Sequence, residues 1–240
     1  MLNSSILLLT STISPQDWHF VGRKGIDERE EDYFLALSFY SKFNLPIVFI
    51  DNSGHFSKRI NSVISNISES EYLTFLSNHS NKGKGHGELE IIKYAFENSK
   101  LINKYDNIIK ISGRYIISNF IHFLSNLTFN NKIHCCNYSR RFSWVDTRIM
   151  ILDHYFINNY LFPTMDKFLD EPSSIFFERV YARSIHLFQY DGGKILLWPT
   201  YPFYNAINGE NGRSIKFSFF KKIKYRLFYN VKKFVFSQTI

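Results

Sequence analysis

The chain has 240 residues, 45% of them apolar, with only 11 Gly and 6 Pro, which is enough for one substantial core and excludes a disordered chain. Its formal net charge is +8, and eight basic residues and no acidic one lie between positions 213 and 240. The other 21 basic residues equal the 21 acidic ones, and a neutral body with a basic tail argues against nucleic-acid binding, which needs an extended basic face.

The two cysteines, Cys135 and Cys136, are adjacent and cannot form a disulfide framework. Because no C-x-x-C or H-x-x-x-H spacing lies near them, we expect two buried thiols in a reducing cytosol. The apolar run at residues 6–9 is too short for a signal peptide, and no later segment reaches about 18 uncharged apolar residues. We therefore expect a cytoplasmic protein.

The first 115 residues alternate between patterns typical of strands and of helices. Buried strands are predicted at 4–12, 45–54, 70–77 and 105–112, and a helix at 27–44. Residues 81–99 open as a glycine-rich loop and continue as an amphipathic helix. Strands at 132–139 and 143–152, a helix at 173–188 and an aromatic-rich loop at 198–212 follow. The alternation predicts an α/β fold with a mostly parallel central sheet flanked by helices.

Several predicted strands end in polar residues, which would meet at one edge of a parallel sheet. The first ends in Thr10, Ser11 and Thr12, the second in Asp51, and the strand at 105–112 runs into Gly113. In open α/β sheets ligands bind outside the carboxyl ends of the strands. We expect one crevice that offers hydroxyls, a carboxylate and cations to a ligand.

The loop "NKGKGHGE" has three glycines within five residues, directly before a predicted helix. Its free amides would face an anion at the helix N-terminus, helped by Lys82, Lys84 and His86. The pattern is neither a Walker loop nor G-x-G-x-x-G, so a flexible solvated loop stays the alternative. For His134, His154 and His186, which show no metal-ligand spacing, a structural role is expected.

The order of "IVFIDNSG", "GKGHGELEIIKYAFENS" and "YDNIIKISGRY" resembles small bacterial glycosyltransferases of GT-A type that act in O-antigen, capsule or lipooligosaccharide assembly. The resemblance covers roughly the first half of the chain. It implies a GT-A-like (Rossmann-like) domain over residues 1–212, with a nucleotide-binding half at 1–118, an acceptor half at 119–212 and a tail at 213–240. It also implies that Thr10, Ser11, Thr12 and Asp51 hold the nucleotide of a nucleotide-sugar donor.

That family often places an Asp-x-Asp element, which binds a divalent metal, where this chain has Ser112, Gly113 and Arg114. Because an arginine repels a cation, we expect Arg114, helped by Lys82 or Lys84, to neutralise the donor phosphate without metal. Gly113 would allow close approach to the donor. A structural salt bridge is the alternative for Arg114. No metal ligand is predicted, and Mn²⁺ or Mg²⁺ as a cofactor stays open.

A transfer that inverts configuration needs a general base for the acceptor hydroxyl. Our first candidate is Glu178, on an otherwise apolar helix face, and our second is Asp146, in "WVDTR". A buried ion pair is the alternative for Glu178, and neither residue is the base if configuration is retained. The other carboxylates weighed for this role are Asp166, Asp170 and Glu171.

Tyr201 and Tyr204, with the turn at 208–212, are expected to flank an acceptor sugar, since aromatic faces stack on pyranose rings. An ordinary aromatic loop is the alternative.

The tail places apolar residues at helical spacing among lysines, which is typical of a helix that lies in an anionic membrane interface. The residues expected to contact the membrane are Phe220, Lys221, Lys222, Leu227 and Lys232. Packing against the domain and nucleic-acid binding are the alternatives.

The resemblance, together with the basic tail, implies a glycosyltransferase that moves a sugar from a nucleotide-sugar donor to a lipid-linked or surface glycan acceptor at the inner face of a bacterial membrane. One alternative is a non-enzymatic membrane- or nucleic-acid-binding α/β module with a static anion site. Another is a phosphoryl transferase, which ordinarily needs a metal held by acidic residues.

Overall fold

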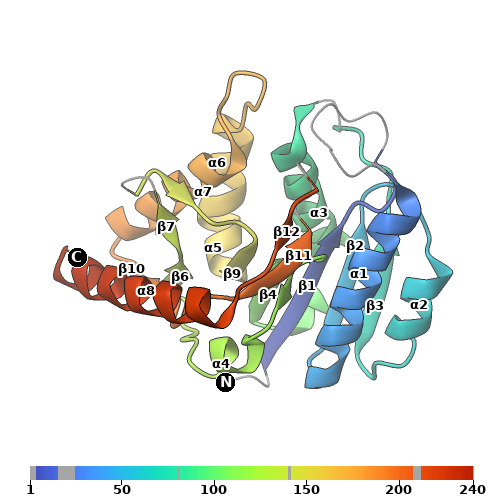
Figure 1. The fold of residues 1–240 in the computed structure, drawn as a ribbon. Helices are drawn as coiled ribbons and strands as arrows, with labels where there is room; N and C mark the ends of the chain where they lie inside the picture. Colours follow the sequence, from blue (N-terminus) through green and yellow to red (C-terminus); the bar gives the residue numbers. More distant parts are fainter. Residues whose placement is uncertain (1–3, 16–24, 80–81, 140–141, 208–211, 240) are drawn as a thin grey trace.

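A computed structural model describes residues 4–15, 25–79, 82–139, 142–207 and 212–239. The chain is a mixed α/β protein built on a five-stranded sheet in the order β3-β2-β1-β4-β9, with helices on both faces (Figure 1). Its first four strands in sequence are parallel, and β9 pairs antiparallel with β4. The strands are β1 (Ser5–Ser11), β2 (Ile47–Asp51), β3 (Ser70–Thr74), β4 (Asn107–Ser112) and β9 (Ile149–Asp153).

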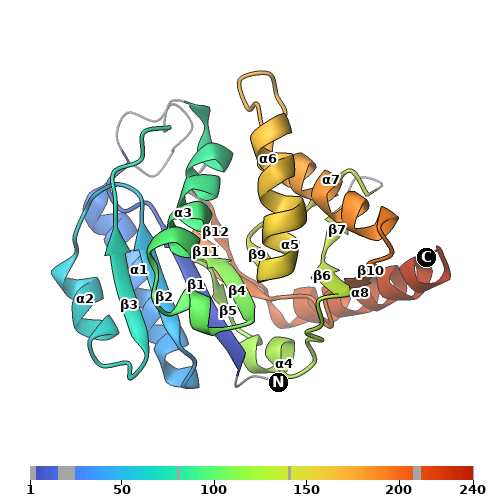
Figure 2. The ribbon, with the colours of Figure 1, turned by 180° about the vertical axis from the view of Figure 1, so that it is seen from behind.

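Helices connect the parallel strands and cover the sheet from both sides. The chain moves outward from β1 through β2 to β3 and then returns past them to β4. Because such crossovers are right-handed, this reversal places α1 and α2 on one face and α3 on the other (Figure 2). It also leaves a topological switch point between β1 and β4, where α/β sheets bind ligands. These helices are α1 (Ile26–Tyr40), α2 (Lys58–Ile64) and α3 (Lys84–Asn98).

The core lies in the central strands, which are buried along their whole length. Every residue of β1 and β2 is buried, as expected for parallel strands covered on both faces. Their continuous apolar and β-branched runs follow from that environment, since neither face meets water. β1 ends in Thr10 and Ser11 and β2 ends in Asp51, so these two strands present polar side chains at one edge of the sheet.

The second half of the chain adds short strand pairs and further helices beside β9. Cys135 and Cys136 lie in β6 and are free and buried, as predicted. The short strands are β5 (Ile116–Ile117), β6 (Ile133–Cys136), β7 (Tyr138–Ser139), β8 (Trp144–Val145), β10 (Lys194–Leu197), β11 (Tyr204–Ile207) and β12 (Ser214–Ile215). The helices of this half are α4 (Phe120–Leu124), α5 (His154–Phe156), a π-helical turn (Ile157–Leu161), α6 (Phe162–Phe168), α7 (Phe177–Tyr190) and α8 (Phe219–Thr239). In the first half, 3-10 turns at Ser41–Phe43 and Ile102–Lys104 follow α1 and α3.

The predicted fold class is confirmed, and four of the predicted strands form the parallel part of the sheet. Two details differ. The strand predicted at 143–152 is split into β8 and β9 by a turn at 146–148, and α3 begins at Lys84, inside the predicted glycine-rich loop. The α2 helix and the helical segment at 154–168 were not predicted. No helix in the described part of the chain is long and apolar enough to cross a membrane.

Gly113 packs against the backbone of β1, and this corrects the expectation that it admits a ligand. Its N–H donates to the Thr10 carbonyl oxygen at 2.8 Å, and a Cβ at Gly113 would lie 2.8 Å from the same oxygen.

We predict that Gly113→Ala lowers the free energy of unfolding by about 1–3 kcal/mol, because the backbone must move to admit the methyl group. Chemical denaturation measures this. Gly25→Ala is the control, since its new Cβ would meet only the flexible Glu28 side chain at 3.4 Å; equal losses in both variants would contradict the prediction.

Candidate functional site

The polar strand ends meet at the switch point between β1 and β4. Thr10 of β1 is the register partner of Ser112 of β4. The Ser112 N–H donates to the Arg148 carbonyl oxygen at 3.0 Å, which brings the turn between β8 and β9 to the same edge. Residues far apart in the sequence therefore converge at this edge.

The centre of this edge is an ion pair between the buried Lys110 and the partly exposed Glu88. The Lys110 side chain is 1% exposed, and its ammonium contacts Glu88 Oε1 and donates to the Thr147 carbonyl oxygen at 2.9 Å. Thr10 Oγ1 donates to the same Glu88 oxygen at 3.1 Å. One lysine thus links the end of β4, the first turns of α3, the end of β1 and the β8–β9 turn. A buried ammonium without such partners would be strongly destabilising.

Three further carboxylates gather around this ion pair. Glu178 lies in the first turn of α7 and is only partly exposed. Burial raises its pKa above the ordinary value, and the negative charges of Glu171 and Asp146 raise the pKa further, whereas its own backbone N–H and the Lys110 charge lower it. A carboxylate with a raised pKa among other charges is a pattern found at catalytic sites.

The glycine-rich start of α3 binds an anion, and that anion is the side chain of Glu171. The His86 N–H donates to Glu171 Oε2 at 3.1 Å, and the His86 ring Nδ1 lies 3.3 Å from the same oxygen. A Cβ at Gly83 or Gly85 would collide with Glu171 or Phe177, so both glycines are needed for this approach. The amides expected to face the donor phosphate therefore hold a carboxylate from the α6–α7 loop. Lys82 is exposed and Lys84 lies in the first helical turn.

Asp51 is buried at the end of β2 and holds two loops together. Its Oδ2 accepts from Ser11 Oγ at 2.9 Å and from the Ile13 N–H at 2.7 Å. Its Oδ1 accepts from the Ser53 N–H and Oγ at 2.9 and 2.5 Å. Since both oxygens accept hydrogen bonds and the residue is 0% exposed, Asp51 holds these loops together and does not face solvent. Thr12 is more accessible, and its Oγ1 donates to Asn52 Oδ1 at 2.6 Å.

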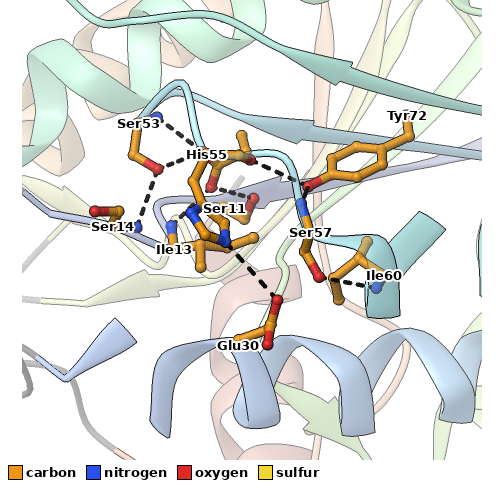
Figure 3. A network of polar contacts seen from close by, with 10 residues as sticks. Ser11, Ile13, Ser14, Glu30, Ser53, His55, Ser57, Ile60 and Tyr72 are labelled. Atoms are coloured by element: carbon orange, nitrogen blue, oxygen red, sulfur yellow. Dashed lines mark hydrogen bonds and ion pairs between the residues drawn. The ribbon is translucent and has the colours of Figure 1, made fainter. Parts of the chain in front are cut away.

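The same loops are braced from β3 and α1 (Figure 3). The Tyr72 hydroxyl accepts from the Ser57 N–H at 3.0 Å and donates to the His55 carbonyl oxygen at 3.2 Å. The His55 ring lies 3.8 Å from a carboxylate oxygen of Glu30 on α1. These loops are therefore held by hydrogen bonds from β3 and by an ion pair with α1.

Arg114 follows β4 directly and keeps one buried hydrogen-bonding atom unused. Its Nη1 is buried and has no hydrogen-bond partner among the described residues. Its guanidinium carbon lies 5.9 Å from the centre of the Tyr115 ring. Because a buried donor without a partner is costly, such an atom at a ligand-binding edge is typical of a group that binds an anion. The predicted structural salt bridge is not found for this nitrogen within the described part of the chain.

Asp146 is paired with Arg148 beside the expected acceptor tyrosines. Arg148 Nε and Nη2 donate to the two Asp146 oxygens at 2.9 and 2.5 Å, and its guanidinium lies 4.1 Å from the Tyr204 ring centre. Tyr204 is buried, so as placed it supports Arg148 and has no face open to a sugar. Tyr201 is half-buried, and burial raises its pKa while the nearby Arg148 charge lowers it. Most of the turn at 208–212 lies outside the described residues.

The described residues do not offer a fitting set of ligands for a divalent metal ion. They contain no group of three or more His, Cys, Asp or Glu side chains arranged to hold one. The carboxylates nearest to β4 are already engaged, Glu88 by Lys110, Asp146 by Arg148 and Glu171 by the start of α3. An oxygen-rich cage of the kind that Mg²⁺ or Mn²⁺ prefers is not formed by these side chains.

The three histidines expected to be structural, His134, His154 and His186, each have a partner, as predicted. His134 is buried, its Nε2 lies 2.8 Å from the Tyr181 hydroxyl, and burial lowers its pKa to about 3. His154 and His186 each contact a backbone carbonyl oxygen. Among the other acids, Asp166 pairs with Lys93 at the surface and Asp170 pairs with the backbone of Ile175.

Sequence reasoning missed Lys110 and Glu88 as site residues. A signal was present, since Lys110 stands alone in the apolar strand "NIIKIS" and must therefore meet a partner inside the protein. Its partner lies 22 positions away on α3 and only the fold brings the two together. Glu88 directly follows the glycine-rich loop, in which only Lys82, Lys84 and His86 were predicted as site residues.

No family model matches the chain, and no curated protein matches it in sequence. Among solved structures it is similar to core-mannan synthase A (CmsA/Ktr4) from Aspergillus fumigatus in an Mn/GDP form, with 12% identity and a TM-score of 0.47 over 93% of this chain and 85% of that one. It is also similar to the mannosyltransferase Ktr4p from S. cerevisiae in complex with GDP, with 13% identity and a TM-score of 0.48 over 84% and 70% of the two chains.

A third similar structure is a putative nucleotide-diphospho-sugar transferase from Desulfovibrio desulfuricans, with 8% identity and a TM-score of 0.42 over 81% of this chain and 79% of that one. These identities and TM-scores are too low to carry a conclusion about activity or substrate. We therefore base the functional proposal on this chain's own residues.

The ion pair of Lys110 and Glu88 can be tested by substitution. We predict that Lys110→Met lowers the free energy of unfolding by about 2–4 kcal/mol, because it leaves Glu88 with an uncompensated negative charge. Adding Glu88→Gln should recover most of that loss. Chemical denaturation of both variants measures this, with Lys93→Met as the control because its ion pair with Asp166 lies at the surface and contributes less than about 1 kcal/mol. An unchanged double variant relative to Lys110→Met would contradict the prediction.

Proposed function

We propose that the protein is a glycosyltransferase that moves a sugar from a nucleotide-sugar donor to a hydroxyl of an acceptor glycan. The observation that carries the proposal is the convergence of Glu178, whose pKa is raised, with Lys110 and two further carboxylates at the β1–β4 switch point. A site that only binds an anion needs cations and backbone amides. The active site of a group-transfer enzyme also needs carboxylates that take part in the reaction, next to those groups.

The donor would lie along the carboxyl ends of β1, β2 and β4, with its diphosphate next to Arg114. The unpartnered buried nitrogen of Arg114 supports this placement, since a guanidinium can donate two hydrogen bonds to a phosphate and stays charged at any working pH. Lys110 lies beneath the surface and adds positive charge to the site without direct contact. This arrangement would stabilise the leaving nucleoside diphosphate through side chains of the protein itself.

For a transfer that inverts configuration, the acceptor oxygen attacks the anomeric carbon and forms the new glycosidic bond. The bond from that carbon to the phosphate oxygen breaks, and the nucleoside diphosphate leaves with the electron pair. Glu178 takes the proton from the acceptor hydroxyl as it attacks. A raised pKa suits this role, because a general base works best when its pKa approaches the operating pH.

The acceptor in this proposal is a lipid-linked or surface glycan of bacterial polysaccharide assembly, in an O-antigen, capsule or lipooligosaccharide pathway. The early-chain resemblance to glycosyltransferases of those pathways supports it. The transferred group would be a hexose, and the enzyme would work in the cytoplasm at the inner face of the membrane. Asp146, Arg148 and Tyr201 would border the acceptor, since they lie at the same edge as Glu178.

Two other functions fit the observations less well. A static anion-binding module would need no tuned carboxylate, yet Glu178 has a raised pKa beside two others. A phosphoryl transferase would need a metal-holding acidic cluster, and the described residues do not provide one. Nucleotide stabilisation tests the donor site, and the effect of Glu178→Gln on kcat tests the transfer.

We predict that one of UDP, GDP, CMP or dTDP raises the melting temperature selectively, with the same shift in EDTA and in Mn²⁺. Arg114→Ala should weaken that binding by roughly 10- to 100-fold, as expected for loss of a hydrogen bond to a charged group. Arg183→Ala is the control, because it removes the same charge from an exposed position on α7. Thermal shift and calorimetry measure both.

A shift that needs Mn²⁺ would contradict the metal-independent site. Stabilisation by no nucleotide, in any buffer, would contradict the donor site and favour the static module.

We predict that Glu178→Gln lowers kcat by about 100- to 10,000-fold, the usual contribution of a general base, with little change in KM for the donor. In the wild type, activity should fall as the pH drops through the raised pKa of Glu178, above the ordinary value of about 4.3, because protonation removes the base. The variant should lose this acid limb. Asp166→Asn, at the surface, is the control.

Glu178→Gln should lower kcat and at the same time raise the stability of the folded protein. A carboxyl whose pKa is raised by folding destabilises the folded state once it ionises, so Glu178→Gln should raise the free energy of unfolding at neutral pH and not at pH 3. An inactive variant that is also destabilised at neutral pH would instead indicate a structural ion pair.

A further inference from the structure

The C-terminal helix α8 has one face against the body and an opposite face of large apolar side chains in contact with solvent. Tyr229 and Phe236 are buried against the body, while Phe220 is 81% and Leu227 61% exposed. In Figures 1 and 2 the helix runs along one side of the molecule, and its C-terminal end lies at the periphery. The exposed apolar residues of this helix are Phe219, Phe220, Ile223, Tyr225, Leu227, Phe228, Val231, Phe234 and Val235.

The outward stripe follows helical spacing and lies opposite the contacts with the body. Positions 220, 223, 227, 231 and 234 recur every three or four residues, so they share one face of an α-helix. Positions 225, 229, 232 and 236 share the opposite face. The predicted amphipathic helix is therefore present. Its predicted apolar stripe faces away from the domain, which contradicts the alternative that this stripe packs into the core.

Two lysines of the tail bind the body and do not belong to the exposed face. The Lys232 ammonium donates to Asn137 Oδ1 at 2.6 Å and to the Tyr138 carbonyl oxygen, and the Lys233 ammonium donates to the Pro199 carbonyl oxygen at 2.9 Å. Lys232 was expected at a membrane, and this contact with the body corrects that expectation. These bonds fix the rotation of the helix, and so they determine which side faces outward.

We infer that the outward face of α8, the lipid face (Phe220, Ile223, Leu227, Val231, Phe234), lies in the interface of an anionic membrane. Lys221, Lys224 and Arg226 are exposed beside it, and residues 213–240 contain no acidic side chain. Apolar side chains of this size enter the acyl boundary while flanking cations bind anionic headgroups. A second copy of the chain fits less well, because pairing two such faces would bring like charges together.

The position of α8 also connects the membrane to the acceptor side of the site. The Tyr201 ring lies 5.1 Å from the Tyr225 ring and 5.6 Å from the Tyr229 ring, measured between centroids. Tyr201 in turn lies close enough to Arg148, which pairs with Asp146, for the Arg148 charge to lower the Tyr201 pKa against the raising effect of burial. A single aromatic side chain thus separates the lipid-facing helix from the charged edge of the site. This second step rests on the proposed function: an acceptor carried in the same membrane would reach the site from this side.

The test is sedimentation of the full chain with vesicles of phosphatidylglycerol and phosphatidylethanolamine, compared with vesicles of phosphatidylcholine alone. We expect binding to the anionic vesicles and weakening by salt. Lys221→Gln and Lys224→Gln should each weaken binding about five-fold, the usual contribution of one basic residue near an anionic surface. The double variant L227N/V231N should weaken it more than 10-fold. Leu76→Asn, an equally exposed leucine elsewhere on the surface, should leave it unchanged.

The melting-temperature shift of L227N/V231N with nucleotide separates this inference from the proposed function. If the variant loses lipid binding and keeps the nucleotide shift, the substitutions have changed α8 and left the donor site intact. Equal binding of the wild type and L227N/V231N to anionic vesicles would overturn the inference. So would a lipid-free wild-type dimer that becomes monomeric in L227N/V231N, which would make the face a contact between two copies.

Discussion

The buried ammonium of Lys110 is the constraint on which the rest of the site depends. A charge on an interior strand of a mostly parallel sheet is tolerated only if partners meet it inside the protein. Those partners come from α3 and the β8–β9 turn, and Glu88 of α3 also accepts from Thr10 of β1, so the Lys110–Glu88 pair fixes how four segments meet. The carboxylates of the α6–α7 loop and of α7 then lie within range of the same charge, and the pKa of Glu178 reflects all of them.

This arrangement gives the two halves of the chain distinct tasks. The parallel strands of the first half supply a rigid edge of hydroxyls and amides, braced by the buried Asp51. The second half brings the acids and the Arg148 pair to that edge, and it places α8 against the opposite side of Tyr201. In the proposed enzyme the donor would contact mainly the first half and the acceptor mainly the second. The early resemblance to glycosyltransferases covers only the first of these halves.

The sequence predicted the parallel sheet well because its strands are buried on both faces and read as continuous apolar runs. It also predicted the edge that carries the candidate site, since β1 and β2 end in polar residues after continuous apolar runs. It failed where partners are distant. The ligand of the glycine-rich helix start is Glu171, and the partner of Lys110 is Glu88. Such pairings depend on how loops return to the sheet, and residue patterns alone do not contain that information.

In the proposed enzyme, a nucleotide-sugar donor binds at the β1–β4 switch point with its phosphates on Arg114. A crystal structure of the protein with the nucleotide that stabilises it most tests this directly. We predict a phosphate oxygen within hydrogen-bond distance of Arg114 Nη1, with Glu178 on the side where the sugar would project. A nucleotide bound elsewhere, with Arg114 Nη1 still without an anion, would contradict it.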